Sequence, residues 1–413
     1  MELSVNDEII KEELGAEGRG AGVEIETYIP VVEPFDPATI SIEPRVVPMD
    51  AVLRRLRQHT IRLAPTFQRN YVWDSIRQSR LIESLMLRIP LPMFYVAANA
   101  DGTWDVVDGL QRLTTIRDFL LGGQKEVPEA KQFQLIELEF WGDRFNTKTF
   151  LEIESDPLNS RIINNILETE MRFTVINPGT PEEVKRNIFK RINTGGMPLT
   201  LQEIRHALYQ GPATELLKDL VDSIDFQNAI GRSIDDSRMA GRELVLRFLA
   251  FYIFESDTFD GDMDNLLSNT MRTINQLPIN SNSTLTQIFK GKNVPRLRVN
   301  DISTARASFI RAMNRSLEFF GDYAFRKGIG GQRRTPVNKA LFEAWATIFA
   351  ILPETDYKAL LQQKKKFHEK YDALLKQDDF DRAISRDSSS AFGVKERYIR
   401  LNELVTKSLS DHD

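Results

Sequence analysis

Hydrophobic and polar positions follow two different periods along the first half of the chain. Apolar residues recur at helical spacing over 81–86 and over 113–123, where a pair of glycines ends the second pattern. Short runs rich in β-branched and aromatic residues predict strands at 93–97, 103–108, 133–141 and 171–177. This mixture of helices and strands predicts an α+β domain over 45–200.

Beyond residue 200 the apolar pattern is almost wholly helical. Helices are predicted at 302–320, 337–351, 355–375 and 391–409. Residues 1–44 are acidic and interrupted by proline and glycine, which predicts a flexible N-terminal arm. We therefore expect an arm at 1–44, an α+β domain at 45–200 and a mainly helical C-terminal domain at 201–413.

Composition excludes several classes of protein. The 54 Lys and Arg residues against 59 Asp and Glu give a net charge of -5, which excludes a generally basic nucleic-acid coat. The absence of cysteine excludes disulfides, zinc fingers and iron–sulfur clusters. Four scattered histidines do not form the cluster that an HNH nuclease centre requires. No apolar run approaches the roughly 20 residues needed to span a bilayer, and the acidic N-terminus does not resemble a secretory signal, so we expect a cytoplasmic protein without a membrane partner.

The most informative segment is DGLQRLTT at 108–115, where a predicted strand turns directly into a predicted helix. Backbone amides at a helix start form a phosphate site, Arg112 can add a bidentate contact, and Thr114 and Thr115 can donate hydrogen bonds. Asp108 can hold magnesium or orient water. A simple turn with a threonine cap explains the same residues, and the residues alone leave both interpretations open.

A second segment, PTFQRNYVW at 65–73, interleaves polar and aromatic residues. Gln68 and Arg69 can donate to phosphate while Tyr71 and Trp73 offer a stacking face. Core packing of the aromatic residues with a solvated Arg69 is the alternative, and without further information it is favoured.

A third segment, FKRINTGGMPLT at 189–200, predicts a helix that stops at Asn193 and a second helix that Thr200 caps together with Glu203. Asn193 could face a ligand, although capping explains most of these residues. The chain contains no GxxxxGK[ST] segment, which excludes a Walker-type nucleotide site.

In order and spacing, the segments FQRNYVW, DGLQRLTT and FKRINTGGMPLT resemble the signatures of the GmrSD-type restriction endonuclease N-terminal domain family. The resemblance covers 45–210 and implies a ParB/sulfiredoxin-like fold that binds and hydrolyses NTP in bacterial anti-phage defence, coupled to DNA nicking or cleavage. It implies that Asp108, Gly109, Gln111 and Arg112 form the nucleotide-hydrolysis motif, and Gln68 and Arg69 match pocket residues of the family. Together with the chemistry of the three segments, this predicts Asp108, Gln111 and Arg112 as catalytic residues, with Mg²⁺ at Asp108. The predicted nucleotide-binding residues are Gln68, Arg69, Gly109, Arg112, Thr114, Thr115 and Asn193. Leu110 replaces the usual glutamine, which puts the role of that position in doubt.

A basic loop in the helical region places four cations within nine residues, between flexible glycines. The loop RKGIGGQRR contains Arg326, Lys327, Arg333 and Arg334. DNA-phosphate contact is the functional interpretation. A solvated loop is the alternative and is slightly favoured.

Three hypotheses follow for the function. The leading one is an NTP-hydrolysing component of a restriction or anti-phage system, with an effector or nuclease protein as partner. The second is a non-catalytic DNA- or nucleotide-sensing adaptor that recruits an effector, which the missing nuclease centre favours. The least favoured is a stand-alone nuclease, since only one motif carboxylate is evident. The sequence does not identify the nucleotide, the trigger or the oligomeric state.

Overall fold

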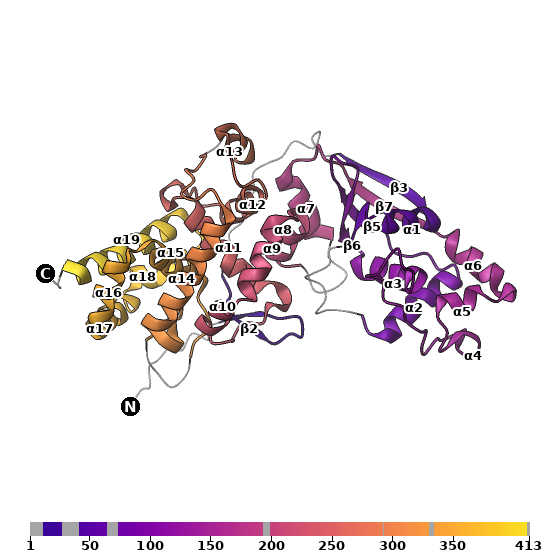
Figure 1. Cartoon of the computed structure of the whole chain (residues 1–413), viewed down its shortest axis with the longest axis horizontal. Coiled ribbons are helices and arrows are strands. Elements are labelled where there is room, and N and C mark those ends of the chain that lie inside the picture. Colours follow the sequence, from indigo (N-terminus) through magenta and orange to yellow (C-terminus); the bar gives the residue numbers. More distant parts are fainter. Residues whose placement is uncertain are drawn as a thin grey trace, which may run out of the picture. The chain divides into compact units, whose positions relative to one another are not determined.

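The computed structural model describes residues 11–26, 41–63, 73–192, 199–291, 293–329 and 334–410. The chain divides into two compact units (Figure 1). The sheet unit comprises Glu33–Leu199, and the helical unit comprises Met1–Val32 together with Thr200–Asp413. The helical unit thus takes in the N-terminal segment as well as the C-terminal half.

The sheet unit is built on five strands of mixed direction. The strands are β3 (Ile42–Pro48), β4 (Ile61–Arg62), β5 (Phe94–Ala98), β6 (Trp104–Asp108) and β7 (Glu170–Ile176), in the order β3-β7-β5-β6-β4. The β3–β7 and β5–β6 pairs are antiparallel, whereas β5–β7 and β4–β6 are parallel. The predicted strands at 93–97, 103–108 and 171–177 are confirmed.

One face of the sheet carries an aromatic core. The ring of Phe173 lies 5.3 Å from that of Phe94 and 5.5 Å from that of Trp104. Arg55, from a helix beside the sheet, stacks on Trp104 with its guanidinium carbon 3.8 Å from the ring centroid. The helices of this unit are α1 (Met49–Arg57), α2 (Ser75–Met86), α3 (Leu110–Leu121), α4 (Gly142–Phe145), α5 (Phe150–Glu154), α6 (Ser160–Leu167) and α7 (Glu182–Ile192), with a 3₁₀ turn at Pro157–Asn159.

The strand predicted at 133–141 is wrong. This segment is irregular, and its last backbone amides bond to a buried side chain instead of a neighbouring strand. The carboxylate of Glu83 accepts hydrogen bonds from the amides of Glu139, Phe140 and Trp141 at 2.9, 2.7 and 2.9 Å. Because the Glu83 side chain satisfies these donors, strand pairing is not needed for them.

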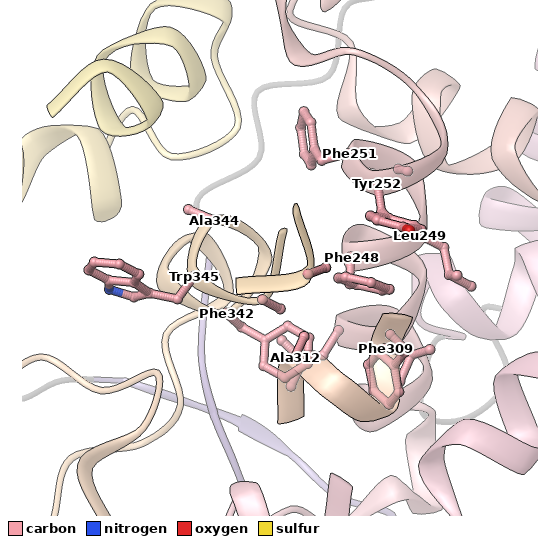
Figure 2. Packing of buried hydrophobic residues seen from close by; sticks show 14 of the residues in the cluster. Phe248, Leu249, Phe251, Tyr252, Phe309, Ala312, Phe342, Ala344 and Trp345 are labelled. Carbon is pink, nitrogen blue, oxygen red and sulfur yellow. The ribbon is translucent and has the colours of Figure 1, made fainter. Parts of the chain in front are cut away.

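The helical unit packs around α11 (Ala240–Ile253), which is buried on nearly all sides. Figure 2 shows Phe248 of α11 beside Phe309 of α14 (Ile302–Phe320), with ring centroids 5.1 Å apart. Phe342 and Trp345, from α15 (Lys339–Ile351), belong to the same core. The remaining helices are α8 (Leu201–Leu208), α9 (Pro212–Val221), α10 (Ile224–Ala229), α12 (Met263–Ile274), α13 (Asn282–Ile288), α16 (Glu354–Gln362), α17 (Lys364–Leu375), α18 (Asp378–Ile384) and α19 (Ala391–Ser410), with 3₁₀ turns at Asp236–Arg238, Ser256–Thr258 and Gly321–Tyr323.

The predicted helical pattern of this region is confirmed for 302–320, 337–351 and 391–409, to within about two residues at each end. The helix predicted at 355–375 is divided, because α16 ends at Gln362 and α17 begins at Lys364. None of the helices in the described segments combines the length and the apolar character needed to cross a membrane.

The expectation of a flexible N-terminal arm is wrong for residues 11–26. Strands β1 (Glu12–Leu14) and β2 (Gly20–Glu24) form an antiparallel hairpin within the helical unit. Val23 is fully buried, and the amide of Glu24 donates to the carbonyl of Val337 at 2.9 Å. Beyond β2, Glu26 forms an ion pair with buried Arg247 of α11. A few well-placed apolar and acidic residues therefore anchor a segment whose average composition is typical of a flexible chain.

Candidate functional site

The junction of β6 and α3 depends on a glycine. Gly109 lies between Asp108 and the first residue of α3 and has a φ of 90°, in the left-handed region that favours glycine. A Cβ at this position would lie 2.3 Å from Cδ1 of Phe94. Both the backbone angle and the contact with Phe94 therefore require glycine, which lets the helix begin immediately after the strand.

Arg112 is held by its own chain. Its guanidinium donates to the carboxylate of Asp108 at 3.0 Å and to the carbonyl oxygens of Pro92 and Met93. It also lies over the ring of Phe94, with its central carbon 4.4 Å from the centroid, and its side chain is 12% exposed. Burial lowers the pKa of Arg112, and the charge of Asp108 partly opposes this effect. In this arrangement Arg112 joins the turn to the entrance of β5, and direct phosphate binding by Arg112 stays a prediction.

A β-bulge sets the position of Asp108. Val96 pairs with Val106, whereas the preceding residue of β5, Tyr95, pairs with Asp108, so Val107 is an extra residue on β6. Without it, Asp108 would lie opposite the buried Phe94. Bulges next to functional sites commonly re-aim one side chain in this way. The Asp108 side chain remains 35% exposed although one oxygen bonds Arg112.

The hydrophobic pattern of the chain predicts neither this bulge nor a role for Tyr95. In β5, Tyr95 lies between the buried Phe94 and Val96, and this alternation indicates that its side chain lies on the other face of the sheet. The extra residue on β6 has no comparable signal, since WDVV is apolar or aromatic at three of four positions and all four are buried.

The start of α3 lies directly beside the Asp108 turn. α3 begins at Leu110, directly after Gly109, and the amide of Leu113 donates to the carbonyl of Gly109 at 2.9 Å. The amides of the first turn of a helix point out of its N-terminal end. Such amides and the positive end of the helix dipole attract phosphate. The side-chain oxygen of Gln111 accepts from the amide of Trp73 at 3.4 Å, so the end of the second sequence segment meets the first here.

The two threonines of the DGLQRLTT segment differ in exposure. Thr114 is half-buried, whereas Thr115 is only 1% exposed and lies among the buried residues of α3. Its burial argues against a direct ligand contact by Thr115. Gln68, Arg69 and Asn193 lie outside the described residues, and their assignment to a nucleotide pocket stays a prediction.

The third sequence segment ends in the helix cap that its residues predict. Thr200 accepts from the amide of Glu203 at 3.1 Å, and the Glu203 carboxylate accepts from the amide of Thr200 at 2.6 Å. Arg238 adds an ion pair to Glu203 at 3.0 Å. These contacts confirm the predicted capping box at the start of α8.

The first two cations of the basic loop predicted to bind DNA make contacts within the helical unit. Arg326 is 4% exposed and donates to the carbonyls of Thr335 and Ile230 and to the hydroxyl of Ser233. Lys327 forms an ion pair with Glu24 at 3.3 Å and donates to the hydroxyl of Ser385 at 2.7 Å. These contacts explain both cations as structural residues, without a nucleic-acid partner.

The other two cations of the loop differ. Arg334 is 42% exposed and lies 3.6 Å from the carboxylate of Asp322, and Arg333 is outside the described residues. DNA binding by the loop stays a prediction. Three of its four cations have partners within the protein, so the loop does not present four free cations.

Asp108 has the chemistry expected of a magnesium ligand. Within the described segments, no group of three or more His, Asp or Glu residues is placed to hold a metal by itself. Magnesium commonly uses one or two carboxylates and completes its shell with water and substrate phosphates. A single half-exposed carboxylate beside the start of a helix fits that donor set.

The sheet unit is thus a mixed α/β domain in which a carboxylate and the start of a helix meet at one strand end. Residues 53–210, which are less than half of the chain, match the family model of the GmrSD restriction endonuclease, N-terminal domain, so this segment is similar to that family. The match indicates a function related to restriction and anti-phage nucleases. Among curated proteins and among solved structures, no match to the chain was found.

Proposed function

We propose that the protein binds and hydrolyses a nucleoside triphosphate at the β6–α3 junction, as a cytoplasmic component of an anti-phage restriction system. The observation that carries the proposal is the position of Asp108. A bulge directs it to the half-exposed side of β5, and Arg112 fixes one of its oxygens beside the start of α3. The proposal includes a ParB/sulfiredoxin-like nucleotide-binding fold for the sheet unit.

In this mechanism the terminal phosphate lies against the first amides of α3, and the helix dipole offsets its charge. Asp108 accepts a hydrogen bond from the attacking water and orients it toward phosphorus. Arg112 acts as a positioning residue, because its bonds to Asp108 and to the carbonyl of Met93 hold the carboxylate in place. Magnesium bound at Asp108 would neutralise phosphate charge during transfer.

A partner would supply DNA nicking or cleavage. The four histidines of the whole chain are isolated in sequence, at 59, 206, 368 and 412, and an HNH-type centre needs them clustered. We therefore place the cutting step in an effector or nuclease protein whose activity depends on the nucleotide state of this chain.

A second candidate function is a nucleotide-sensing adaptor without turnover. The contacts of Arg112 favour this function, because its guanidinium already donates hydrogen bonds to one carboxylate and two backbone carbonyls. Phosphoryl transfer usually needs free cations that stabilise the charge of the transition state. The adaptor would bind nucleotide at the same site and signal through occupancy.

Two measurements on the full chain test the proposal: calorimetric titration with ATP, GTP, CTP and UTP, and an assay of phosphate release from each nucleotide. Both are made with magnesium and with EDTA. Saturable binding of at least one nucleotide and magnesium-dependent release of phosphate would support the enzyme. Binding without release, including when DNA is added, would support the adaptor. If none of the four nucleotides binds, the site is not a nucleotide site.

A further inference from the structure

Three side chains are aligned across the sheet next to the β6–α3 junction. Asp108 of β6 pairs with Tyr95 of β5, and Tyr95 pairs with Thr174 of β7. Residues directly opposite each other on neighbouring strands project from the same face. Adjacent strands lie about 4.8 Å apart, so this row extends roughly 10 Å from Asp108. A row of that length corresponds to a substantial part of a nucleotide.

The row lies on the face opposite the aromatic core. Phe94 and Phe173 precede Tyr95 and Thr174 in their strands, and their rings pack together 5.3 Å apart. Because successive residues of a strand point to opposite faces, Tyr95 and Thr174 point away from that core. Both are half-buried, whereas Phe94 and Phe173 are at most 2% exposed. A ligand can therefore reach both hydroxyl-bearing side chains.

Neither hydroxyl is committed to a strong acceptor. Thr174 donates to the thioether sulfur of Met93 at 3.5 Å, and a thioether is a weak acceptor. Within the segments that the structure describes, the Tyr95 hydroxyl makes no hydrogen bond. Met93 also links this row to the junction, since its carbonyl accepts from Arg112 at 3.3 Å.

We propose that Tyr95 and Thr174 are ligand-binding residues of the nucleotide site, and that their hydroxyls donate hydrogen bonds to the bound nucleotide beside Asp108. This inference rests on the proposed function. Asp108 offers only acceptors when ionised, so a phosphate or ribose oxygen near it needs donors from neighbouring strands. The bound nucleotide then extends from the start of α3 across β5 toward β7, with its phosphates at the helix.

The competing explanation is that both hydroxyls are merely solvated. It predicts that removal of either hydroxyl leaves nucleotide affinity unchanged. Tyr95→Phe and Thr174→Val remove one hydroxyl each and keep the volume of the side chain, so packing changes little. Tyr323→Phe and Thr355→Val remove the same groups in the helical unit and serve as matched controls.

The test measures nucleotide Kd, kcat and KM for these four variants and for the double variant Tyr95→Phe/Thr174→Val. A neutral hydrogen bond corresponds to about a two- to tenfold change in affinity, so we expect each sheet variant to raise Kd by that factor. We expect the double variant to raise Kd roughly by the product, with an unchanged melting temperature and no effect of the controls. A merely structural role would instead lower the melting temperature.

The inference is overturned if both sheet variants and the double variant keep Kd and KM within twofold of the wild type while Asp108→Asn impairs hydrolysis. In that case the proposed function stands and the row is not part of its site. If the wild type binds no nucleotide, the proposed function fails, and this inference fails with it.

Discussion

The guanidinium of Arg112 lies 3.0 Å from the carboxylate of Asp108, across the single turn that joins β6 to α3. The same guanidinium bonds the carbonyls of Pro92 and Met93 at the entrance of β5. One side chain therefore fixes the candidate catalytic carboxylate and connects two neighbouring strands. Any change at Arg112 is expected to alter both the stability of this edge and the function of Asp108.

The first prediction concerns Gly109. Gly109→Ala places a methyl group 2.3 Å from the Phe94 ring at a φ of 90°, so we expect a loss of stability of more than about 2 kcal/mol. Gly102→Ala is the matched control, because Gly102 has a φ of 81° and nothing within 4 Å of its added Cβ. We expect about 1 kcal/mol for the control, from the backbone alone. Equal losses in urea denaturation would show that contact with Phe94 does not restrict the turn.

The second prediction concerns Arg112. Arg112→Lys keeps the charge but cannot reproduce the three contacts of the guanidinium, so we expect a loss of about 1.5–3 kcal/mol and weaker nucleotide hydrolysis. Arg117→Lys is the control, since Arg117 lies on the same helix and binds Asp118 at 2.6 Å. Hydrolysis that falls equally in both variants would contradict a specific role for Arg112.

Several parts of this site could be predicted from local sequence. The acid–glycine turn and the capping box at Thr200 depend on residues within four positions of each other, so their spacing in the chain is sufficient. The bulge at Val107 and the pairing of Asp108 with Tyr95 depend on register between strands, which local patterns do not encode.

The misplaced strand and the N-terminal hairpin illustrate the same limit. Glu83 captures amides that lie more than fifty residues later in the chain. Glu26 pairs with Arg247 across 221 positions. Long-range partners of this kind determine the structure that a segment adopts, although its composition is unchanged. A prediction from composition alone therefore assigns the wrong structure to the segment.

The third prediction concerns the N-terminal hairpin. Deletion of residues 1–26 removes the buried Val23 and the Glu26 partner of Arg247, whose side chain is 3% exposed. Arg247 keeps its ion pairs with Glu243 and Glu343, so the loss comes mainly from the buried hairpin residues, and we expect the helical unit to lose about 2 kcal/mol or more of stability. Deletion of residues 1–10 keeps these contacts and is the control. If both deletions unfold at the same urea concentration, the hairpin does not stabilise the unit.

The fourth prediction concerns pH. Burial, and secondarily the charge of Arg242, lowers the pKa of His206 to about 3. The unfolded chain binds this proton near pH 6.5, so between about pH 6.5 and 3 stability falls as pH falls. His206→Gln should remove about 2 kcal/mol of the loss between pH 7 and pH 5.

Asp236 contributes with the opposite sign, because burial raises its pKa to about 6 and stabilises its protonated form. The comparison must therefore be made between variants, not from the wild-type curve. His59→Gln is the control, since the His59 side chain is 67% exposed. Parallel pH curves for the wild type and His206→Gln would show that His206 is not held neutral by the fold.

The most direct measurement of the central claim is steady-state NTP hydrolysis by Asp108→Asn beside the wild type and Asp143→Asn. The amide oxygen of Asn can still accept from Arg112, so the fold should persist, while the ability to orient and activate water is lost. Asp143 is exposed on α4 of the same unit and controls for loss of one carboxylate. We predict that Asp108→Asn lowers kcat by about 100-fold or more, with nucleotide still bound, and that Asp143→Asn leaves kcat unchanged. Wild-type kcat in a folded Asp108→Asn variant would contradict a catalytic role for this carboxylate.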